Sequence, residues 1–551
     1  MKKSKKLIAA LLASLMVLST AACSDGETQS SSSQQSGTNS SAAGETSSVE
    51  TSDTGEEGTY DTHVDLSWYK EGITGHEINY DGDAFGQFWQ DKFNVTIDLT
   101  AATMDGSDWS ERLRIWINSG DMPDVAHWAF NYGELADYAA QDAVYRLPDD
   151  WKERWPNAAK TQSYVPGAAV AEEKLGGTYV LFRTIFANHR PSERLSYHAL
   201  LYMRKDWMEA CGVEIKETYS PSELVEIAEK FRDQDPGGLG SQLVPISIHT
   251  YDMPKLYFPP PMDGYYKDEN GQFQWAPADE RTLESLKKYQ NLYTSGLLDP
   301  EFYTLTRYEG TEKFYIGGTA GIVLDDGMCY MIQSRMEDGL QKNLGLDPDE
   351  VMHIAQLVGE DGKYHYREDP NFYGSIIFSP NLTDEEFERA MDILDFCSTE
   401  EGQEIINMGF EGEDWELDEN GEYVSLLPNE ITGNASSILG SKYPSADVFF
   451  GGIIVADDFQ FVSPNYTKET RDIVSHFYEL RDELSDETTL LPREYDYDFY
   501  SSRAKTQANI DLAAEYAQLI LKEGDLETNW KNWVDEKMQL VQPFLDELNQ
   551  Q

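Results

Sequence analysis

Aromatic rings that stand beside polar side chains are the residues of this sequence with the clearest chemistry. The stretch "HWAFNYG" (127–133) follows a short strand pattern and brings together Trp128, Phe130, Asn131 and Tyr132. Such rings stack on apolar C–H faces, while amides, carboxylates and guanidinium groups hydrogen-bond to hydroxyls. This combination suits non-covalent binding of a polyhydroxylated ligand such as a sugar. The chain is rich in these rings, with 12 Trp and 32 Tyr.

Other stretches offer the same pairing of rings with polar groups at the ends of predicted strands. The further candidate ligand contacts are Trp68 and Tyr69 in "HVDLSWY", Tyr179 and Arg183 in "YVLFRTIF", Tyr251 and Tyr257 near "YFPPPMDGYY", Asp325, Asp326 and Tyr330 in "LDDGMCY", and Glu411 and Trp415 in "FEGEDW". The prolines around Tyr257 fit a plain surface loop equally well. Trp109 and Trp116 recur at helical spacing, which predicts core packing instead. Arg204 and Asp206 are expected to form structural contacts at a helix start.

Motifs of covalent or cofactor chemistry do not occur in the chain. It has no GxSxG, HExxH, P-loop or GxGxxG segment, and its nine histidines are scattered singly. We therefore expect no enzyme and no cofactor. A glycoside hydrolase stays open as an alternative, because it needs only two carboxylates and the chain has 99 Asp and Glu residues. Cys211, Cys329 and Cys397 are too widely spaced for a disulfide framework or a zinc site, so no metal site is predicted from them.

The N-terminal segment predicts export. Lysines at positions 2, 3, 5 and 6 precede an apolar run, 7–22, that is too short to span a bilayer, which is typical of a signal peptide, 1–22. "STAAC" resembles the bacterial lipobox, with Cys23 as the lipidated residue, although Thr20 stands where leucine is usual. Ordinary secretion is the alternative. The Ser-, Thr-, Gly- and Glu-rich remainder of 23–59 is expected to be a disordered tether.

Charge excludes one class of partner. The chain carries 43 Lys and Arg against 99 Asp and Glu, a formal net charge of −56. A surface with this much negative charge repels phosphate backbones. Nucleic-acid binding is therefore not expected. The acidity also argues mildly against a uronate ligand.

Strand and helix patterns alternate along the rest of the chain. Strands are expected at 63–69, 93–100 and 124–128, with a helix at 108–119 between the last two. "YHALLYMRKDWMEACGV" reads as a strand entering a helix, and "YSPSELVEIAEKF" has Ser220 and Glu223 at capping-box spacing. This alternation predicts α/β lobes, and the length predicts at least two of them.

Six stretches, taken in order, resemble the family 1 extracellular solute-binding proteins of bacterial ABC importers. They are "INSGDMPDV" (117–125), "ALLYMRKDWMEACGV" (199–213), "LYTSGLLDPEFY" (292–303), "FYIGGTAGIV" (314–323), "CSTEEGQEIINMGFEGEDWELDENGEYV" (397–424) and "LKEGDLETNWKNWVDE" (521–536). The resemblance implies a two-lobed periplasmic-binding-protein-like fold with an interlobe ligand cleft and a multi-strand hinge. Lobe 1 would comprise 60–185 with 376–435, and lobe 2 would comprise 190–372 with 440–551. The chain would cross near 185–198, return near 373–380 and leave again near 435–445.

The resemblance also implies a function and partners. The protein would be a monomeric lipoprotein on the outer face of the cell membrane, of the Gram-positive type, that captures an oligosaccharide for two permease subunits and a separate ATPase. A peptide- or signal-binding lipoprotein that feeds a sensor is the other alternative. Some members of this branch bind calcium in a loop that corresponds to "RDQDPGGLGSQLVPIS", but this loop has few carboxylates, so no calcium is expected. Asn420-Gly421 predicts a hairpin turn.

Overall fold

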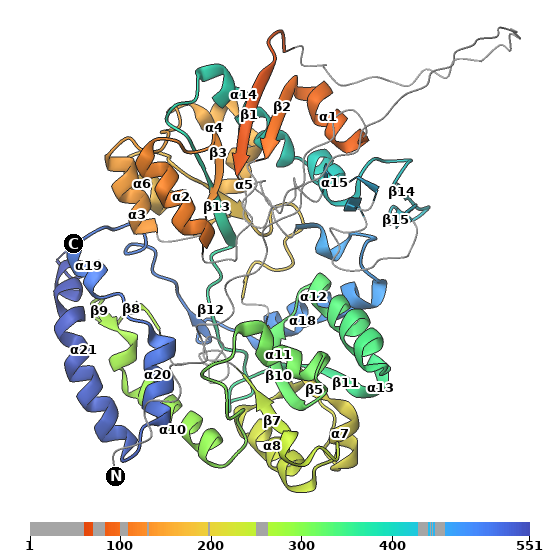
Figure 1. Ribbon diagram of the computed structural model, residues 1–551, viewed down its shortest axis with the longest axis vertical. Helices are drawn as coiled ribbons and strands as arrows, with labels where there is room; N and C mark the ends of the chain where they lie inside the picture. Colours follow the sequence, from red (N-terminus) through yellow and green to blue (C-terminus); the bar gives the residue numbers. More distant parts are fainter. Residues whose placement is uncertain are drawn as a thin grey trace, which may run out of the picture. The chain divides into compact units, whose positions relative to one another are not determined.

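The computed structural model describes residues 60–69, 83–99, 108–128, 132–196, 199–248, 263–427, 439–440, 442–443, 445–446 and 458–550. All of them belong to one compact unit, Glu57–Gln551. They form two five-stranded mixed sheets with helices around each (Figure 1). The predicted α/β class is confirmed. The expected signal peptide, Cys23 and the tether lie outside the described residues.

The first sheet has the order β2–β1–β3–β13–β4. Its strands are β1 (Val64–Tyr69), β2 (Val95–Leu99), β3 (Val125–Trp128), β4 (Leu181–Thr184) and β13 (Phe372–Phe378). β1 runs parallel to β2 and β3, whereas β13 is antiparallel to β3 and β4, with Ile376 opposite both His127 and Leu181. Figure 1 shows this green strand from the middle of the chain beside the orange N-terminal strands.

Both faces of the first sheet are buried. Leu66 and Trp68 of β1 pack into one apolar cluster and Tyr69 packs into a second one, as the two-residue period of a strand requires. The helices of this part are α1 (Ala84–Phe93), α2 (Asp108–Ser119), α3 (Tyr132–Ala140), α4 (Trp151–Arg154), α5 (Pro156–Gln162), α6 (Pro166–Leu175), α14 (Asp384–Cys397) and α15 (Glu400–Met408). The predicted helix 108–119 is confirmed as α2.

The second sheet has the order β6–β11–β5–β10–β7. Its strands are β5 (Ala199–Arg204), β6 (Thr218–Tyr219), β7 (Val244–Ser247), β10 (Ala320–Asp326) and β11 (Met352–Leu357). β5 lies in the middle, antiparallel to both β10 and β11, while β10 is parallel to β7. Leu201 and Met203 face one apolar cluster, and Leu200 and Tyr202 face another.

Helices surround the second sheet as well. They are α7 (Lys205–Ala210), α8 (Pro221–Gln234), η1 (Gly240–Gln242), η3 (Ala276–Ala278), α10 (Glu280–Thr294), α11 (Arg307–Tyr315), α12 (Cys329–Ser334), η4 (Arg335–Leu344), α13 (Pro348–Val351), η5 (Asp458–Phe461), α18 (Lys468–Leu484), α19 (Arg503–Gln507), α20 (Leu512–Leu521) and α21 (Leu526–Leu548). α8 begins with the predicted capping box, because the side chain of Ser220 accepts from Glu223 N and the Glu223 carboxylate accepts from Ser220 N. No described helix is long and apolar enough to cross a bilayer.

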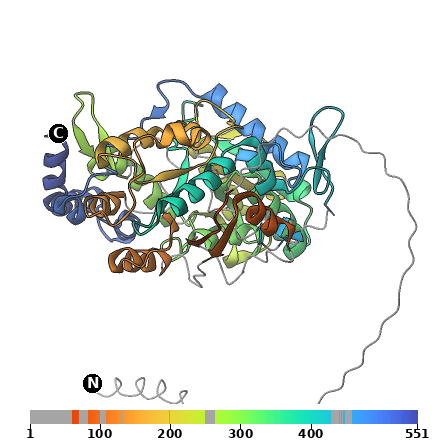
Figure 2. The ribbon, with the colours of Figure 1, turned by 90° about the horizontal axis from the view of Figure 1, so that it is seen from above.

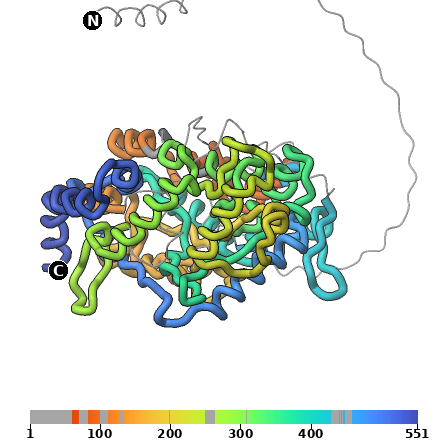
Figure 3. Tube along the Cα trace, turned by 90° about the horizontal axis from the view of Figure 1, so that it is seen from below, coloured from red at the N-terminus to blue at the C-terminus, as the bar shows by residue number. Residues whose placement is uncertain are grey.

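Two hairpins with the same four-residue turn sequence, "DENG", extend from the helical layers (Figures 2 and 3). They are β8 (Tyr265–Lys267) with β9 (Phe273–Trp275), and β14 (Trp415–Leu417) with β15 (Tyr423–Ser425). In each turn the aspartate carboxylate accepts two backbone amides and the glycine has φ near +80°, at +74° for Gly271 and +81° for Gly421. The hairpin predicted at Asn420-Gly421 is confirmed.

The segment 493–500 packs into both halves of the fold. Phe499 belongs to the Tyr69 cluster of the first sheet and lies 5.1 Å from the ring of Tyr132. Tyr497 and Tyr500 pack against the cluster of the second sheet, and the Tyr500 ring stacks at 6.2 Å on Phe544 of α21. We call residues 493–500 the strap.

Candidate ligand-binding site

The carboxyl ends of parallel strands are where open α/β sheets bind ligands, and β1 and β3 end side by side. Trp68 and Tyr69 stand at the end of β1, with exposed fractions of only 2% and 0%. The Tyr69 ring meets Trp116 edge-on at 5.0 Å. Both candidates therefore serve core packing in this structure, and their contact with a ligand stays a prediction.

Tyr132 begins α3 and lies in an aromatic cluster. Its ring centroid is 5.7 Å from Phe182, 5.9 Å from Phe372 and 5.1 Å from Phe499. Burial raises the pKa of its phenol well above the usual value, while a side-chain hydrogen bond with Ser375 opposes that rise. Tyr179 is likewise buried in this cluster. The backbone of Trp128 closes β3, but its side chain lies outside the description, as do Phe130, Asn131, Tyr251 and Tyr257.

Arg183 of β4 and Tyr373 of β13 are the pair of side chains in the first sheet that is best suited to contact a ligand. Arg183 is buried, and its guanidinium lies 5.7 Å from the centroid of the Tyr373 ring. Tyr373 is 55% exposed, so much of its ring lies at the surface. Gly374 has φ of +74°, and a β-carbon there would collide with the His127 ring, so the glycine lets that ring pack against β13. Neither Tyr373 nor His127 is predicted from the sequence as a ligand contact, because their proximity depends on the pairing of β13 with β3.

Asp325 and Asp326 end β10, the corresponding position of the second sheet. The Asp325 side chain is 2% exposed, accepts from Arg335 Nε at 3.0 Å and caps the backbone amide of Asp326 at 2.9 Å. Burial raises the pKa of Asp325, and Arg335 opposes this rise. The Asp326 carbonyl accepts from the Tyr202 hydroxyl at 2.6 Å. Tyr330, in α12, is half-buried. Asp325 is thus committed to an internal ion pair.

Glu411 and Trp415 lie at the base of the β14–β15 hairpin. Trp415 is 3% exposed, packs with Met408 and Phe459, and donates its indole N–H to the Gly409 carbonyl at 3.0 Å. Glu411 is exposed. In this structure Trp415 is therefore a core residue of a small cluster, and its contact with a ligand stays a prediction.

The loop considered for calcium is held by its own aspartate. Asp235 adopts φ of +45°, and its carboxylate accepts from Leu239 N at 2.8 Å and Gly240 N at 2.9 Å. No group of three His, Cys, Asp or Glu side chains suited to a metal ion occurs among the described residues. Arg204 pairs with Asp206 at 2.8 and 2.5 Å, which confirms their expected structural role.

The chain is similar in sequence to curated lipoproteins and transport proteins. It is 23% identical over 346 residues to lipoprotein LipO of Bacillus subtilis (strain 168), covering 60% of this chain and 64% of LipO. It is 24% identical over 211 residues to the fructooligosaccharide ABC transporter substrate-binding protein FusA of Streptococcus pneumoniae serotype 4, covering 36% of this chain and 38% of FusA. The matched regions thus span less than two thirds of either relative. No family model matches the chain.

Solved structures share its architecture over most of its length. S. pneumoniae FusA in complex with kestose matches with a TM-score of 0.60 at 18% identity, covering 88% of this chain and 99% of that chain. An HMO-binding, ABC-transporter-associated solute-binding protein from Bifidobacterium longum infantis matches with 0.60 at 15% identity, covering 88% and 98%. The chain has the solute-binding-protein fold. The expected two-lobed architecture is thereby confirmed.

In this solute-binding-protein fold, three chain segments meet between the two sheets. Asp369 N donates to Leu195 O at 3.3 Å, and Ser196 forms a bridge with Glu368. On the other side, β12 (Tyr366–Arg367) pairs in parallel with β16 (Leu490–Leu491). Segment 364–369 therefore lies between 194–196 and 484–491, which gives a multi-strand hinge.

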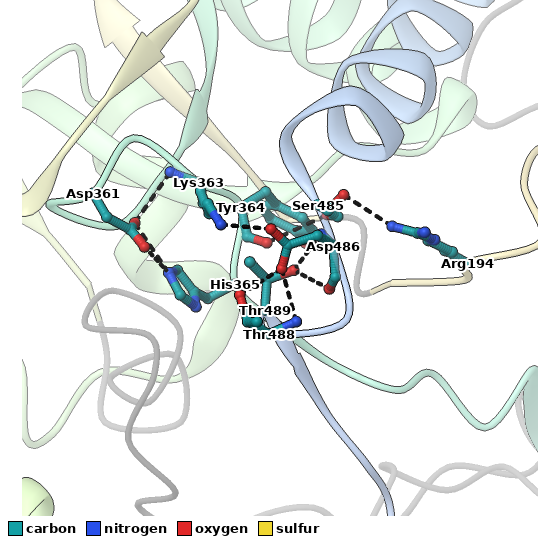
Figure 4. A network of polar contacts seen from close by, with 9 residues as sticks. All are labelled: Arg194, Asp361, Lys363, Tyr364, His365, Ser485, Asp486, Thr488 and Thr489. Carbon is teal, nitrogen blue, oxygen red and sulfur yellow. Dashed lines mark hydrogen bonds and ion pairs between the residues drawn. The ribbon is translucent and has the colours of Figure 1, made fainter.

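Charged side chains tie these hinge segments together (Figure 4). Lys363 donates to Asp486 at 2.5 Å, and the His365 ring meets Asp361 at 2.9 Å. Arg194 donates to the Ser485 carbonyl at 2.9 Å. Lys363 and Arg194 thus each link a neighbouring segment of the chain to segment 484–491.

The strands of the two sheets bracket the expected crossings. β4 ends at Thr184 in the first sheet, and β5 begins at Ala199 in the second sheet. β13 belongs to the first sheet again from Phe372, so the return expected near 373–380 would lie just before that residue. The predicted bounds of the two lobes stay a prediction. The third expected crossing, 435–445, falls largely outside the described residues.

Proposed function

We propose that this protein captures an oligosaccharide in the cleft between its two lobes and delivers it to the permease of an ABC importer. The observation that carries this proposal is the match of the whole fold to FusA, a protein solved in complex with kestose. Sequence similarity to FusA over 211 residues supports the same ligand class. The exposed ring of Tyr373 beside Arg183 supplies a surface on which a sugar can stack.

The proposed partners follow from the same role. Two permease subunits and a separate ATPase would complete the importer, since this chain has no nucleotide-binding motif. The protein would act as a monomer, anchored to the outer face of the cell membrane through lipidated Cys23. LipO, a lipoprotein by name, supports the anchor. Lobe 1 would comprise 60–185 with the segment from Phe372 to 435, and lobe 2 would comprise 190–371 with 440–551.

Binding without chemistry distinguishes this proposal from a glycoside hydrolase. Asp325, the most buried of the candidate carboxylates, pairs with Arg335 and caps a backbone amide, which is a structural arrangement. FusA, one of the two relatives, is a substrate-binding protein of a transporter by its name. We therefore propose that the protein releases the saccharide without cleaving it.

A thermal-shift screen of the purified chain tests the proposal. The ligands are kestose, Man5GlcNAc and a tri-galacturonate, and each incubation is analysed by chromatography. Saturable stabilisation with intact glycan supports a transport receptor. Cleaved glycan would make the protein a hydrolase, and stabilisation by peptides alone would favour the signal-binding alternative.

A further inference from the structure

Four side chains gather at the carboxyl end of β10, beneath the start of η4. The Tyr202 and Tyr315 rings meet edge-on at 5.7 Å, and both are buried. The Arg335 guanidinium lies 5.1 Å from the centroid of the Tyr315 ring and donates from Nε to Asp325 at 3.0 Å. The cluster is thus a buried carboxylate and two phenols, covered by one guanidinium.

Arg335 is the outermost charged group of this cluster. Its side chain is 17% exposed, whereas that of Asp325 is 2% exposed. In the part of the chain that the structure describes, its terminal amino groups donate no hydrogen bond, and Nε carries the only one. A guanidinium has five N–H donors in a planar fork, and four of them are on the terminal amino groups. Those donors are left for a partner outside the chain.

The position of the cluster favours a ligand as that partner. Asp326, the last residue of β10, pairs with Ala199, the first residue of β5, which directly follows the crossing from the first lobe. The carboxyl end of β10 therefore lies at the edge of the second sheet where the chain enters from the first lobe. Ligands of open α/β sheets bind beyond the carboxyl ends of the strands.

The backbone fixes Arg335 in this place. η4, which begins at Arg335, is a π-helix of ten residues, a rare conformation that often occurs at functional sites. Gly339 lets η4 approach α11, because a β-carbon there would lie 2.8 Å from the Tyr315 β-carbon. The guanidinium is therefore held between Asp325 on one edge and the Tyr315 face below.

We propose that the terminal amino edge of Arg335 binds two adjacent hydroxyls of a neutral sugar unit, and that Asp325 is the positioning residue that aims it. This inference rests on the proposed function. Asp325 already neutralises the guanidinium, and the chain carries a formal charge of −56, so a ligand carboxylate gains little attraction there. Two parallel N–H donors match the oxygens of a vicinal diol.

Titration calorimetry on the full chain tests this assignment with kestose and Man5GlcNAc as neutral probes and tri-galacturonate as the acidic probe. Arg335→Gln removes the fork, and we expect at least tenfold weaker binding of the neutral probe. Asp325→Asn leaves the positive charge of the Arg335 guanidinium without its carboxylate partner, and it holds the orientation of that group less firmly. We expect it to weaken neutral binding and to strengthen tri-galacturonate binding, a change of selectivity that a merely structural role would not produce.

Arg204→Gln is the matched control. Arg204 also lies over an aromatic ring, 4.4 Å from Trp207, but its Nε and one amino group are bound to Asp206 and the other amino group donates to Gly318. We expect this variant to lose stability and to keep wild-type affinity. If Arg335→Gln does not fold, Arg335→Lys keeps the charge without the fork, and the same loss is expected.

The outcomes separate the inference from the proposed function. Wild-type protein that binds no saccharide overturns both. Saccharide binding that Arg335→Gln or Arg335→Lys leaves unchanged overturns the inference alone. Tighter wild-type binding of tri-galacturonate than of either neutral probe also overturns it, because a charge-neutral pair cannot favour an anion.

Discussion

The carboxylate of Asp458 accepts a hydrogen bond of 2.5 Å from the backbone amide of Ala187. It also accepts from Asn188 N and His189 N at 3.0 Å, so one buried side chain holds three consecutive amides of the first crossing. From the other end, Asn371 accepts from Phe186 N and donates to Phe186 O, each at 3.0 Å. Two polar side chains from distant parts of the sequence thereby fix the path of the crossing.

Asp458→Ala should lower the free energy of unfolding by about 1–3 kcal/mol per amide left unsatisfied and buried. Urea unfolding followed by tryptophan fluorescence measures the loss. Asp472→Ala is the control, since Asp472 forms an exposed ion pair with Lys468 within α18 and its removal should cost less than about 1 kcal/mol. Equal effects of the two variants would show that Asp458 does not hold the crossing.

Lys505 should make stability rise at alkaline pH. Its ammonium donates to the carbonyls of Tyr497 at 2.5 Å and Asp498 at 2.9 Å, and burial lowers its pKa to about 8. The unfolded chain holds this proton up to a pKa of about 10.4, so it binds more protons than the folded chain between these values. Stability therefore increases with pH across that window, and the cost of the buried charge is greatest below pH 8.

The difference in unfolding free energy between wild type and Lys505→Met isolates this contribution from the other titrating groups. We expect it to shift in favour of the wild type as pH rises from about 8 to about 10.4, by up to about 3 kcal/mol. Chemical denaturation at several pH values measures it. A difference that does not change with pH would contradict a buried, neutral lysine.

Tyr373→Ala should weaken saccharide binding about tenfold, which corresponds to about 1.4 kcal/mol of lost stacking. The ring is 55% exposed, so unfolding should change by no more than about 0.5 kcal/mol. Tyr308→Ala removes an equally exposed ring, also 55%, and should leave affinity unchanged. If both variants bind like the wild type, the sugar does not stack on Tyr373.

Cys23→Ala should release the protein into the culture medium, because the proposed lipid anchor is attached through that sulfur. Immunoblots of membrane and medium fractions measure the distribution. Cys211→Ala, at a buried cysteine, is the control and should stay with the membrane. A Cys23→Ala protein that remains in the membrane fraction would rule out the anchor.

Features set by neighbouring residues were predictable from the sequence. The capping box of Ser220 and Glu223 requires only a three-residue spacing, and it forms as expected. The "DENG" turn shows the same effect, since two copies in different surroundings adopt one hydrogen-bond pattern. In both cases the stabilising hydrogen bonds join residues that lie within four positions of each other in the sequence.

Features set by tertiary pairing were not predictable. Trp68 and Tyr69 end a strand in the expected place, but helices cover both faces of that sheet and bury both rings. Asp325 appears in the sequence as an available carboxylate, and only the turn of η4 brings Arg335 onto it. Tyr373 becomes a candidate through the pairing of β13 with β3, two strands far apart in the chain.

The strap, residues 493–500, has a mechanical consequence. Phe499 packs in the core of the first sheet, and Tyr497 packs against the core of the second sheet. Separation of the lobes would therefore first extend the short length of chain between these two residues. Further opening would have to extract a large aromatic side chain, at a cost of about 1.5–3 kcal/mol. We therefore expect the strap to limit how far the two lobes can separate. Under the proposed function, the length of this short segment would limit the width of the saccharide that fits between the lobes.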